Sequence, residues 1–89
     1  MIAFFSGRLD TAAAVATAEA VKPLQEAENK EIILDCSELE YISSSGLRIF
    51  LSIRKDAAAH GSKVIVRNLG DNIRQVFMMT GFISLFEIV

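Results

Sequence analysis

Short apolar runs alternate with longer mixed stretches along this chain. Residues 31–36 and 63–67 each centre on an uninterrupted aliphatic triplet bounded by charged residues, which is typical of strands buried on both faces in a parallel sheet. Residues 2–5 and 85–89 are further apolar runs that contain aromatic side chains. We predict a strand in each of these stretches, with the first strand ending at Ser6-Gly7.

The stretch after the first run favours a helix. Thr11 to Glu28 is rich in alanine and begins at Asp10-Thr11, whose side-chain oxygens can accept hydrogen bonds from the free N–H groups of a first helical turn. Pro23 is expected to kink this helix or to restart it. The apolar residues spaced for one helical face are Ala12, Val15, Ala16, Ala20 and Leu24.

Two further helices are predicted nearer the C-terminus. One begins at Ser43 or Ser44 and ends near residues 59–61, because glycine is common just past a helix C-terminus. Its expected core positions are Leu47, Phe50, Leu51 and Ala58. The other follows residues 68–71 and stops at Gly81. Its expected inward-facing residues are Ile73, Val76 and Phe77, with Met78 and Met79 filling the core rather than forming a docking patch.

The resulting order of elements is β-α-β-α-β-α-β. Strands that alternate with helices in this way indicate an α/β fold with a mostly parallel sheet and right-handed crossovers. With 89 residues and no internal repeat, linker or low-complexity segment, the chain is expected to form one domain over residues 1–89.

Composition and charge narrow the classes of partner. Nine basic residues stand against eleven acidic ones, a net charge of −2, so no basic surplus suggests nucleic acid or anionic lipid. No apolar run approaches the roughly 20 residues needed to span a membrane, so no direct membrane insertion is expected. The lack of a signal-like N-terminal segment and the single cysteine, Cys36, predict a cytoplasmic protein without internal disulfides.

The same inventory disfavours catalysis. His60 is the only histidine, so no His-rich metal site can form and no histidine pair can share acid–base work. A Ser44 nucleophile would need a base, and His60 is poorly placed for that role. Cys36 is expected to be a packed, inert thiol. We therefore predict a protein that is not an enzyme and that has no cofactor and no metal.

The candidate functional residues lie where strands lead into helices. In an open parallel sheet, function collects beyond the carboxyl ends of the strands, which here are residues 7–11 and 37–46. The second loop contains Ser43-Ser44-Ser45-Gly46. A phosphate there would be stabilised by the free N–H groups and the dipole of the helix, and Gly46 would leave room for its approach. Taken alone, the serines favour plain helix capping over a regulatory site.

Three stretches of the chain carry motifs that favour a regulatory site over plain helix capping. Residues 7–11 are Gly-Arg-Leu-Asp-Thr, residues 35–47 are Asp-Cys-Ser-Glu-Leu-Glu-Tyr-Ile-Ser-Ser-Ser-Gly-Leu, and residues 73–82 place apolar pairs before Thr-Gly-Phe. Together they resemble the motifs of the STAS domain family, the bacterial anti-sigma factor antagonists. The family pattern has Asp-x-Ser after a buried strand, a spacer, and then Asp-Ser-Ser-Gly-Leu or Asp-Ser-Thr-Gly-Leu.

The resemblance implies a fold, a partner and a switch. The fold would be a small sheet with helices mainly on one face. The partner would be a cytoplasmic anti-sigma factor that is also a serine kinase, released when Ser44 is phosphorylated and rebound after a serine phosphatase removes the phosphate. The loop before the first helix and the helix after Ser43 would form the partner face. Its residues would be Asp10, Thr11, Ser43, Ser45, Gly46, Leu47 and Arg48.

Two departures from the family pattern open alternatives. Ser43 stands where the family has Asp before the phosphorylated serine, and members without that Asp include non-phosphorylated subunits of membrane transport complexes for lipids or anions. A non-phosphorylated subunit of such a transport complex is therefore the alternative interpretation of this chain. The family also has a further strand ahead of residues 2–5, which we expect to be truncated here, missing or very short, and this would leave an edge of the sheet open. A partner or a second copy, in a weak dimer, would then cover the edge.

Overall fold

Four parallel strands form the sheet of the computed structural model, which describes residues 1–89. They lie in the order β1-β2-β3-β4, so each strand neighbours the next one in the sequence. The strands are β1 (Ile2–Leu9), β2 (Glu31–Ile42), β3 (Lys63–Arg67) and β4 (Glu87–Ile88). The predicted α/β class, the parallel sheet and the element order are confirmed.

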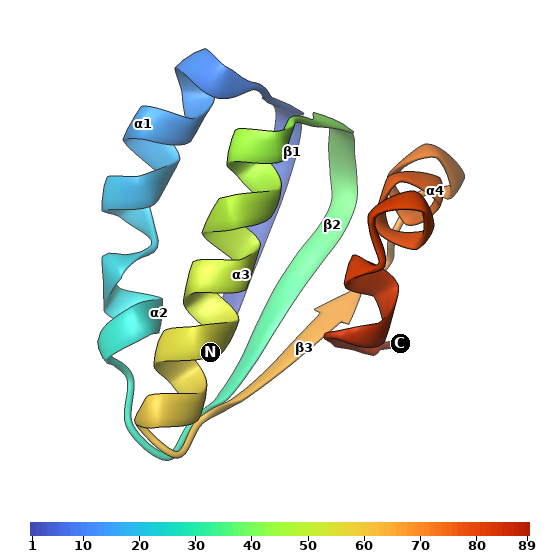
Figure 1. Ribbon diagram of the computed structural model, residues 1–89. Helices are drawn as coiled ribbons and strands as arrows, with labels where there is room; N and C mark the ends of the chain where they lie inside the picture. Colours follow the sequence, from blue (N-terminus) through green and yellow to red (C-terminus); the bar gives the residue numbers. More distant parts are fainter.

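The helices connect these strands and cover one face of the sheet. Figure 1 shows α3 in front of β1, with α1 and α2 beside α3 on the left and α4 on the right, beyond β2 and β3. Their bounds are α1 (Thr11–Ala20), α2 (Lys22–Glu26), α3 (Ser44–Ala59) and α4 (Asp71–Thr80), and a short 3₁₀ helix, η1 (Phe82–Ser84), precedes β4. None of these helices combines the length and the apolar character needed to cross a membrane.

Aromatic side chains tie the helices to the sheet. Phe50 on α3 is fully buried and its ring centroid lies 4.8 Å from that of Phe5 on β1. It lies 5.9 Å from the ring of Phe77 on α4 and 6.4 Å from that of Phe86. Tilted and edge-to-face pairs at these separations are favourable, so Phe50 joins both halves of the domain around one core.

The opposite face of the sheet has no helix. Alternation along β1 directs Phe5 and Leu9 into the core, whereas Ile2 and Phe4 point to the other face. Phe4 is 70% exposed. Ile65 on β3 is buried but lies outside the core cluster, which places it on this face too. The helices therefore lie on one side only, as the resemblance implied.

Several bounds differ from the prediction. β1 continues to Leu9 and β2 to Ile42, so the connector expected after Cys36 is part of a strand. The first helix breaks at Val21, and Pro23 lies in the first turn of α2; this is the restart that proline favours because it has no N–H to leave unpaired there.

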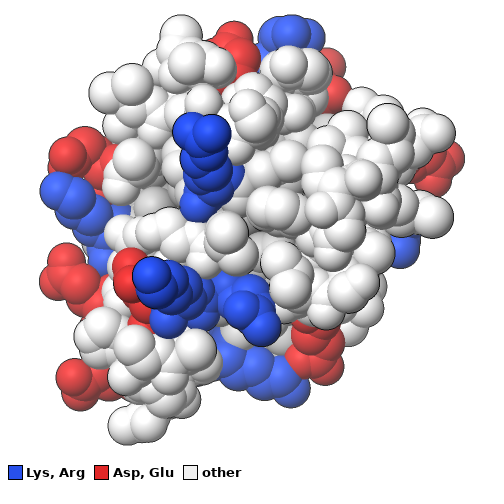
Figure 2. Space-filling model, in the orientation of Figure 1, with Lys and Arg blue, Asp and Glu red and all other residues white.

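The inward faces of the helices also differ in part. On α3, Leu51 and Ala58 are exposed, and Ile49, Ile53 and Ala57 are buried instead. The face expected on the first helix is wrong for α1, because Ala12, Val15, Ala16 and Ala20 are exposed and only Ala14 is buried; Leu24, on α2, is buried as expected. The expectation that Met78 and Met79 fill the core is wrong, because they are 61% and 81% exposed. Figure 2 shows the area over α4 largely free of charge, whereas Lys and Arg side chains gather over α3.

Candidate functional site

Two helix N-termini meet at one end of the sheet. Leu9 ends β1 just before α1, and Ile42 ends β2 just before α3. The two strands are neighbours, and the backbone N–H of Ser43 donates to the carbonyl of Leu9 at 2.9 Å. Residues 7–11 and 43–46, which are 32 or more positions apart in the sequence, are thereby brought together.

Asp10 caps the first of these helices. Its Oδ1 accepts a hydrogen bond from the backbone N–H of Ala13 at 2.9 Å, which satisfies one of the free donors of the first turn. Thr11 follows as the first helical residue and is exposed. The predicted capping role of Asp10 is confirmed, and Thr11 presents its hydroxyl group to the solvent.

The serine run divides into a cap and a free hydroxyl group. Ser43 is the N-cap of α3, and its Oγ accepts from the backbone N–H of Gly46 at 3.2 Å. Ser44 is the next residue, is exposed, and forms no side-chain hydrogen bond within the chain. Ser45 is half-buried. The capping interpretation therefore applies to Ser43, while the hydroxyl group of Ser44 is left free at the positive end of a 16-residue helix.

Gly46 is required by close packing. A Cβ added at this residue would lie 2.8 Å from Ile42 Cγ1 and 2.8 Å from Leu9 Cγ. The expected room for an approaching phosphate is therefore absent, because the side chains that end β1 and β2 occupy it. Leu47 is 5% exposed. Of the predicted partner-face residues, Gly46 and Leu47 hold the helix against the sheet and present almost no surface.

Arginine side chains frame the site. Arg48 is exposed and lies four residues after Ser44, which places both on one face of α3. The guanidinium carbon of Arg8, at the end of β1, lies 4.3 Å from the ring centroid of Tyr41 in the neighbouring register of β2. Arg8 takes part in this cation–π contact and in none of the ion pairs of the chain.

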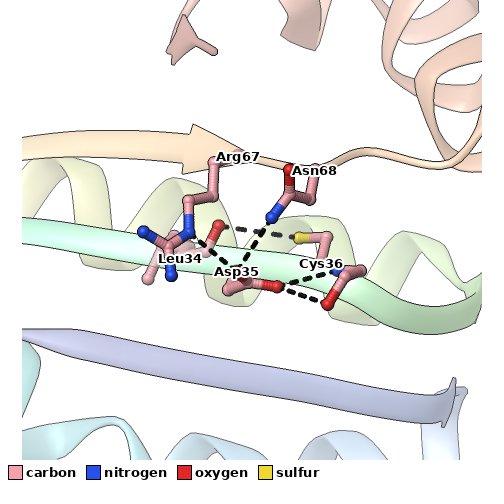
Figure 3. A network of polar contacts seen from close by, with 6 residues as sticks. Leu34, Asp35, Cys36, Arg67 and Asn68 are labelled. Carbon is pink, nitrogen blue, oxygen red and sulfur yellow. Dashed lines mark hydrogen bonds and ion pairs between the residues drawn. The ribbon is translucent and has the colours of Figure 1, made fainter.

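A buried carboxylate lies in the middle of β2 within a network of polar contacts (Figure 3). Asp35 is 3% exposed. Its Oδ1 accepts from the backbone N–H and the hydroxyl group of Ser37 at 2.9 and 2.7 Å, and its Oδ2 accepts from Arg67 Nε at 2.7 Å and Asn68 Nδ2 at 3.1 Å. The Ser37 backbone N–H, followed by Arg67, holds the pKa of Asp35 well below its ordinary value.

Asp35 sits where β2 bulges. One residue of β1, Phe5, lies opposite two residues of β2 between the pairs Phe4–Asp35 and Ser6–Glu38, and the Ser37 N–H bonds to Asp35 instead of joining the ladder. Asp35 and Ser37 belong to the Asp-Cys-Ser motif at residues 35–37, which did not by itself predict this structural role. Their spacing, an acid two residues before a hydroxyl residue, is the signal for this local turn.

The remaining reactive side chains lie away from Ser44. Burial, with a smaller contribution from the charge of Asp35, raises the pKa of the Cys36 thiol to about 12, so the thiol stays protonated near neutral pH. His60 ends α3 at the opposite end from Ser44, with its Nδ1 2.7 Å from the carbonyl of Asp56. No group of three or more His, Cys, Asp or Glu residues could hold a metal ion.

Comparison with known proteins identifies a family and several relatives of this chain. A family model described as the STAS domain matches residues 1–89. The anti-sigma factor antagonist BtrV of Bordetella bronchiseptica is 34% identical over 59 residues, 66% of this chain and 51% of that protein. The anti-sigma-B factor antagonist of Listeria monocytogenes is 28% identical over 85 residues, 96% of this chain and 75% of that protein. The match therefore spans about half the length of BtrV.

Solved structures share the fold. The unphosphorylated form of the anti-sigma factor antagonist SpoIIAA superposes with a TM-score of 0.80 at 22% identity, over 99% of this chain and 77% of that one. A sulfate transporter family protein from Wolinella succinogenes gives a TM-score of 0.81 at 17% identity, over 98% and 73% of the two chains. At these identities the likeness establishes the fold and does not choose between regulator and transporter.

Proposed function

This chain belongs to the STAS domain family, and we propose that it is an anti-sigma factor antagonist that is switched by phosphorylation of Ser44. The observation that carries the proposal is the division between Ser43, which caps α3, and Ser44, whose hydroxyl group is exposed and unbonded. The names of the two relatives at 34% and 28% identity support the same class of protein.

The partner face consists of the exposed and half-exposed residues at the two helix starts. Thr11, Ser44 and Arg48 are exposed, and Asp10, Ser43 and Ser45 are half-exposed. An anti-sigma factor that is also a serine kinase would contact this face while Ser44 is unmodified. Gly46 and Leu47 contribute by fixing the first turn of α3 against Leu9 and Ile42.

A phosphate on Ser44 would change the charge of this face without unfolding it. It adds about −1.5 to −2 charges at neutral pH, and the N–H groups and dipole of α3 stabilise that charge at the helix start. A partner fitted to the uncharged hydroxyl would then have to accept a buried, unpaired dianion, which is strongly unfavourable. A serine phosphatase would restore the binding form.

The Asp of the family pattern at this position would supply both an N-cap and a negative charge, and Ser43 supplies only the N-cap. Serine and aspartate are about equally good N-caps, so the cap survives the difference, as the bond to Gly46 N–H shows. Serine carries no charge, so the negative charge that the family pattern places beside the phosphorylated serine is missing here. If a kinase recognises that charge, Ser43→Asp should increase the rate of phosphorylation, which makes this variant a useful test of the switch.

The second candidate is a non-phosphorylated STAS subunit of a membrane transport complex. This second candidate is favoured because position 43 holds a serine where the family pattern has Asp. The fold is also equally like that of a sulfate transporter family protein. In that function the surface around Ser44 would contact a transport protein constitutively, and Ser44 would carry no phosphate in the cell.

A pull-down with mass spectrometry separates these candidates. Tagged wild type, Ser44→Asp and the control Ser84→Asp, which lies outside the partner face, are used on lysate of the source organism, and bound proteins are identified. Phosphosites are mapped in wild type and in Ser44→Ala. The proposal expects a kinase-type anti-sigma factor on wild type that is lost with Ser44→Asp, and one phosphoserine at Ser44 after addition of ATP. Transport proteins retained by all three variants, or unchanged phosphorylation of Ser44→Ala, would contradict it.

A further inference from the structure

One row of side chains on α3 is exposed along the whole length of the helix. Its members, which we call the α3 stripe, are Ser44, Arg48, Leu51, Lys55 and Ala58. Their spacing of four, three, four and three residues places them on one face of the helix. At 1.5 Å per residue the stripe is about 21 Å long. Because it begins at Ser44, it extends the proposed partner face along α3.

The two basic residues of the α3 stripe have no acidic partner in the domain. Neither Arg48 nor Lys55 takes part in any ion pair of the chain. No Asp or Glu lies three or four residues from either of them, so no acidic side chain of α3 is placed to pair with them. The third basic residue of α3, Arg54, differs because it donates to the carbonyl of Leu85. Two unpaired positive charges therefore flank the exposed Leu51.

The stability of the helix does not account for this arrangement. Lys and Arg stabilise a helix near its C-terminus, but Arg48 is the fifth residue of α3, toward the end where the dipole is positive. The chain as a whole is acidic, with a net charge of −2, so the stripe reverses the charge locally. Figure 2 shows Lys and Arg side chains gathered over α3. Complementarity of charge then favours an acidic partner at this surface.

The spacing of the α3 stripe favours a helix as its occupant. Alternate steps of four and three residues are the spacing by which two helices pack side by side. Arg48 and Lys55 are seven residues apart, which is about 10 Å along the axis. Two acidic residues seven positions apart on a second helix have the same separation, and an apolar residue between them would lie against Leu51.

We propose that the α3 stripe binds an acidic amphipathic helix of the partner protein, with one carboxylate at Arg48, another at Lys55 and an apolar side chain on Leu51. This inference rests on the proposed function, because the stripe begins at Ser44, and it names the chemistry of the partner. A phosphate on Ser44 lies one helical turn before Arg48 and adds negative charge against the acidic helix. Like charges at an interface oppose binding.

Nucleic acid and anionic membranes fit the stripe less well. Both present many negative charges over an extended surface, and their binding depends on clusters of basic residues. The stripe offers two cations on a chain of net charge −2. Leu51 between them provides an apolar contact that a protein helix can use.

A phage-displayed library of random 16-residue peptides tests the proposal without the natural partner. Selection on the wild-type domain is combined with counter-selection on Leu51→Ser, which removes peptides that bind elsewhere and does not itself select for charge. The surviving peptides should carry Asp or Glu about seven residues apart with an apolar residue between them. They should bind Arg48→Glu/Lys55→Glu about tenfold or more weakly than wild type. Exchange of their acidic residues for Lys should restore binding to that double variant.

Lys30→Glu/Arg74→Glu is the matched control. Both residues are exposed and lie off the stripe, and the double change alters the net charge by the same amount. At about 0.15 M salt, charges farther apart than about 8 Å are largely screened, so the control should bind within about twofold of wild type.

Three results would overturn the docking site. They are the absence of surviving peptides, survivors without the acidic pair, and equal affinity of wild type and Arg48→Glu/Lys55→Glu. Tighter binding of duplex DNA or of phosphatidylglycerol vesicles, lost in the same double variant, would overturn it as well. The switch is tested separately with domain carrying phosphoserine at residue 44. Unchanged affinity of the peptides for that form would contradict the switch alone, whereas unchanged affinity for the double variant would contradict the docking site alone.

Discussion

Ser43 and Ser44 are adjacent, yet only one of them is used by the fold. The Ser43 side chain accepts the Gly46 N–H, whereas the Ser44 hydroxyl is exposed and unbonded. The motif alone did not separate these roles, because either serine could have begun the helix. The backbone separates them: Ser43 is extended, with φ −88° and ψ 173°, and Ser44 is the first helical residue.

Stability measurements should distinguish the two serines. Ser43→Ala removes the cap and should lower the free energy of unfolding by about 1 kcal/mol. Ser44→Ala should change it by less than about 0.5 kcal/mol, because the side chain is exposed. Ser43→Asp should match wild type. Urea denaturation followed by circular dichroism measures all three, and an equal loss for both alanine variants would contradict the assignment.

Asp35 should control the acid stability of the domain. Its pKa is lowered in the folded state, so its contacts contribute full stability above its unfolded pKa of about 3.9 and are lost as the pH falls below that value. Asp35→Asn should cost about 3 kcal/mol at neutral pH, since it leaves Arg67 without its partner. It should also flatten the fall in stability below about pH 4.

Glu38→Gln is the matched control for that variant, because Glu38 lies in the same strand and is exposed. Urea midpoints measured from neutral to acidic pH should show the wild-type acid slope in Glu38→Gln. A wild-type slope in Asp35→Asn would mean that another carboxylate controls acid unfolding.

At the scale of elements, the bounds of helices and strands could be predicted where local signals mark them. The bounds of α3, β3 and α4 agree with the sequence expectation, because caps, glycines and aliphatic runs mark them. The extension of β2 through Ser37, Glu38 and Glu40 was missed. Those residues are polar and exposed. At the two bulges, Asp35 accepts from the N–H of Ser37 and Asn72 donates to the carbonyl of Glu40, and the sequence pattern does not reveal these contacts.

The inward face of α1 was not readable for a different reason. Nearly every position from Thr11 to Ala20 is alanine or another small residue, so no periodic contrast identifies one face. Its inward side is evident only in the structure, where Ala14 is the one residue of α1 that is buried.

Substitution of Gly46 tests how closely α3 packs on the sheet. In an exposed helix, Gly→Ala would stabilise by up to about 1 kcal/mol. Here the added methyl group would meet Ile42 and Leu9 at 2.8 Å, so Gly46→Ala should destabilise by about 1–3 kcal/mol. It should also weaken partner binding by moving Ser44. Thermal unfolding gives the sign, and a raised melting temperature would contradict the packing account.

At the scale of the whole molecule, the candidate surface lies at one end of a small core. The Ser44 face lies at the carboxyl ends of β1 and β2, and Leu9 at the end of β1 supports the first turn of α3. Family membership and fold follow from sequence and structure together, while the partner face is a proposal that binding must test.

The most direct measurement compares binding of the anti-sigma factor identified by pull-down to unmodified domain and to domain carrying phosphoserine at residue 44. Ser84→Asp is the control, because Ser84 is exposed in η1, outside the proposed partner face. The account predicts that the phosphate weakens binding about 100-fold or more, as expected for a buried unpaired charge, while the control binds like wild type. Equal affinity of the phosphorylated and unmodified domains would contradict it.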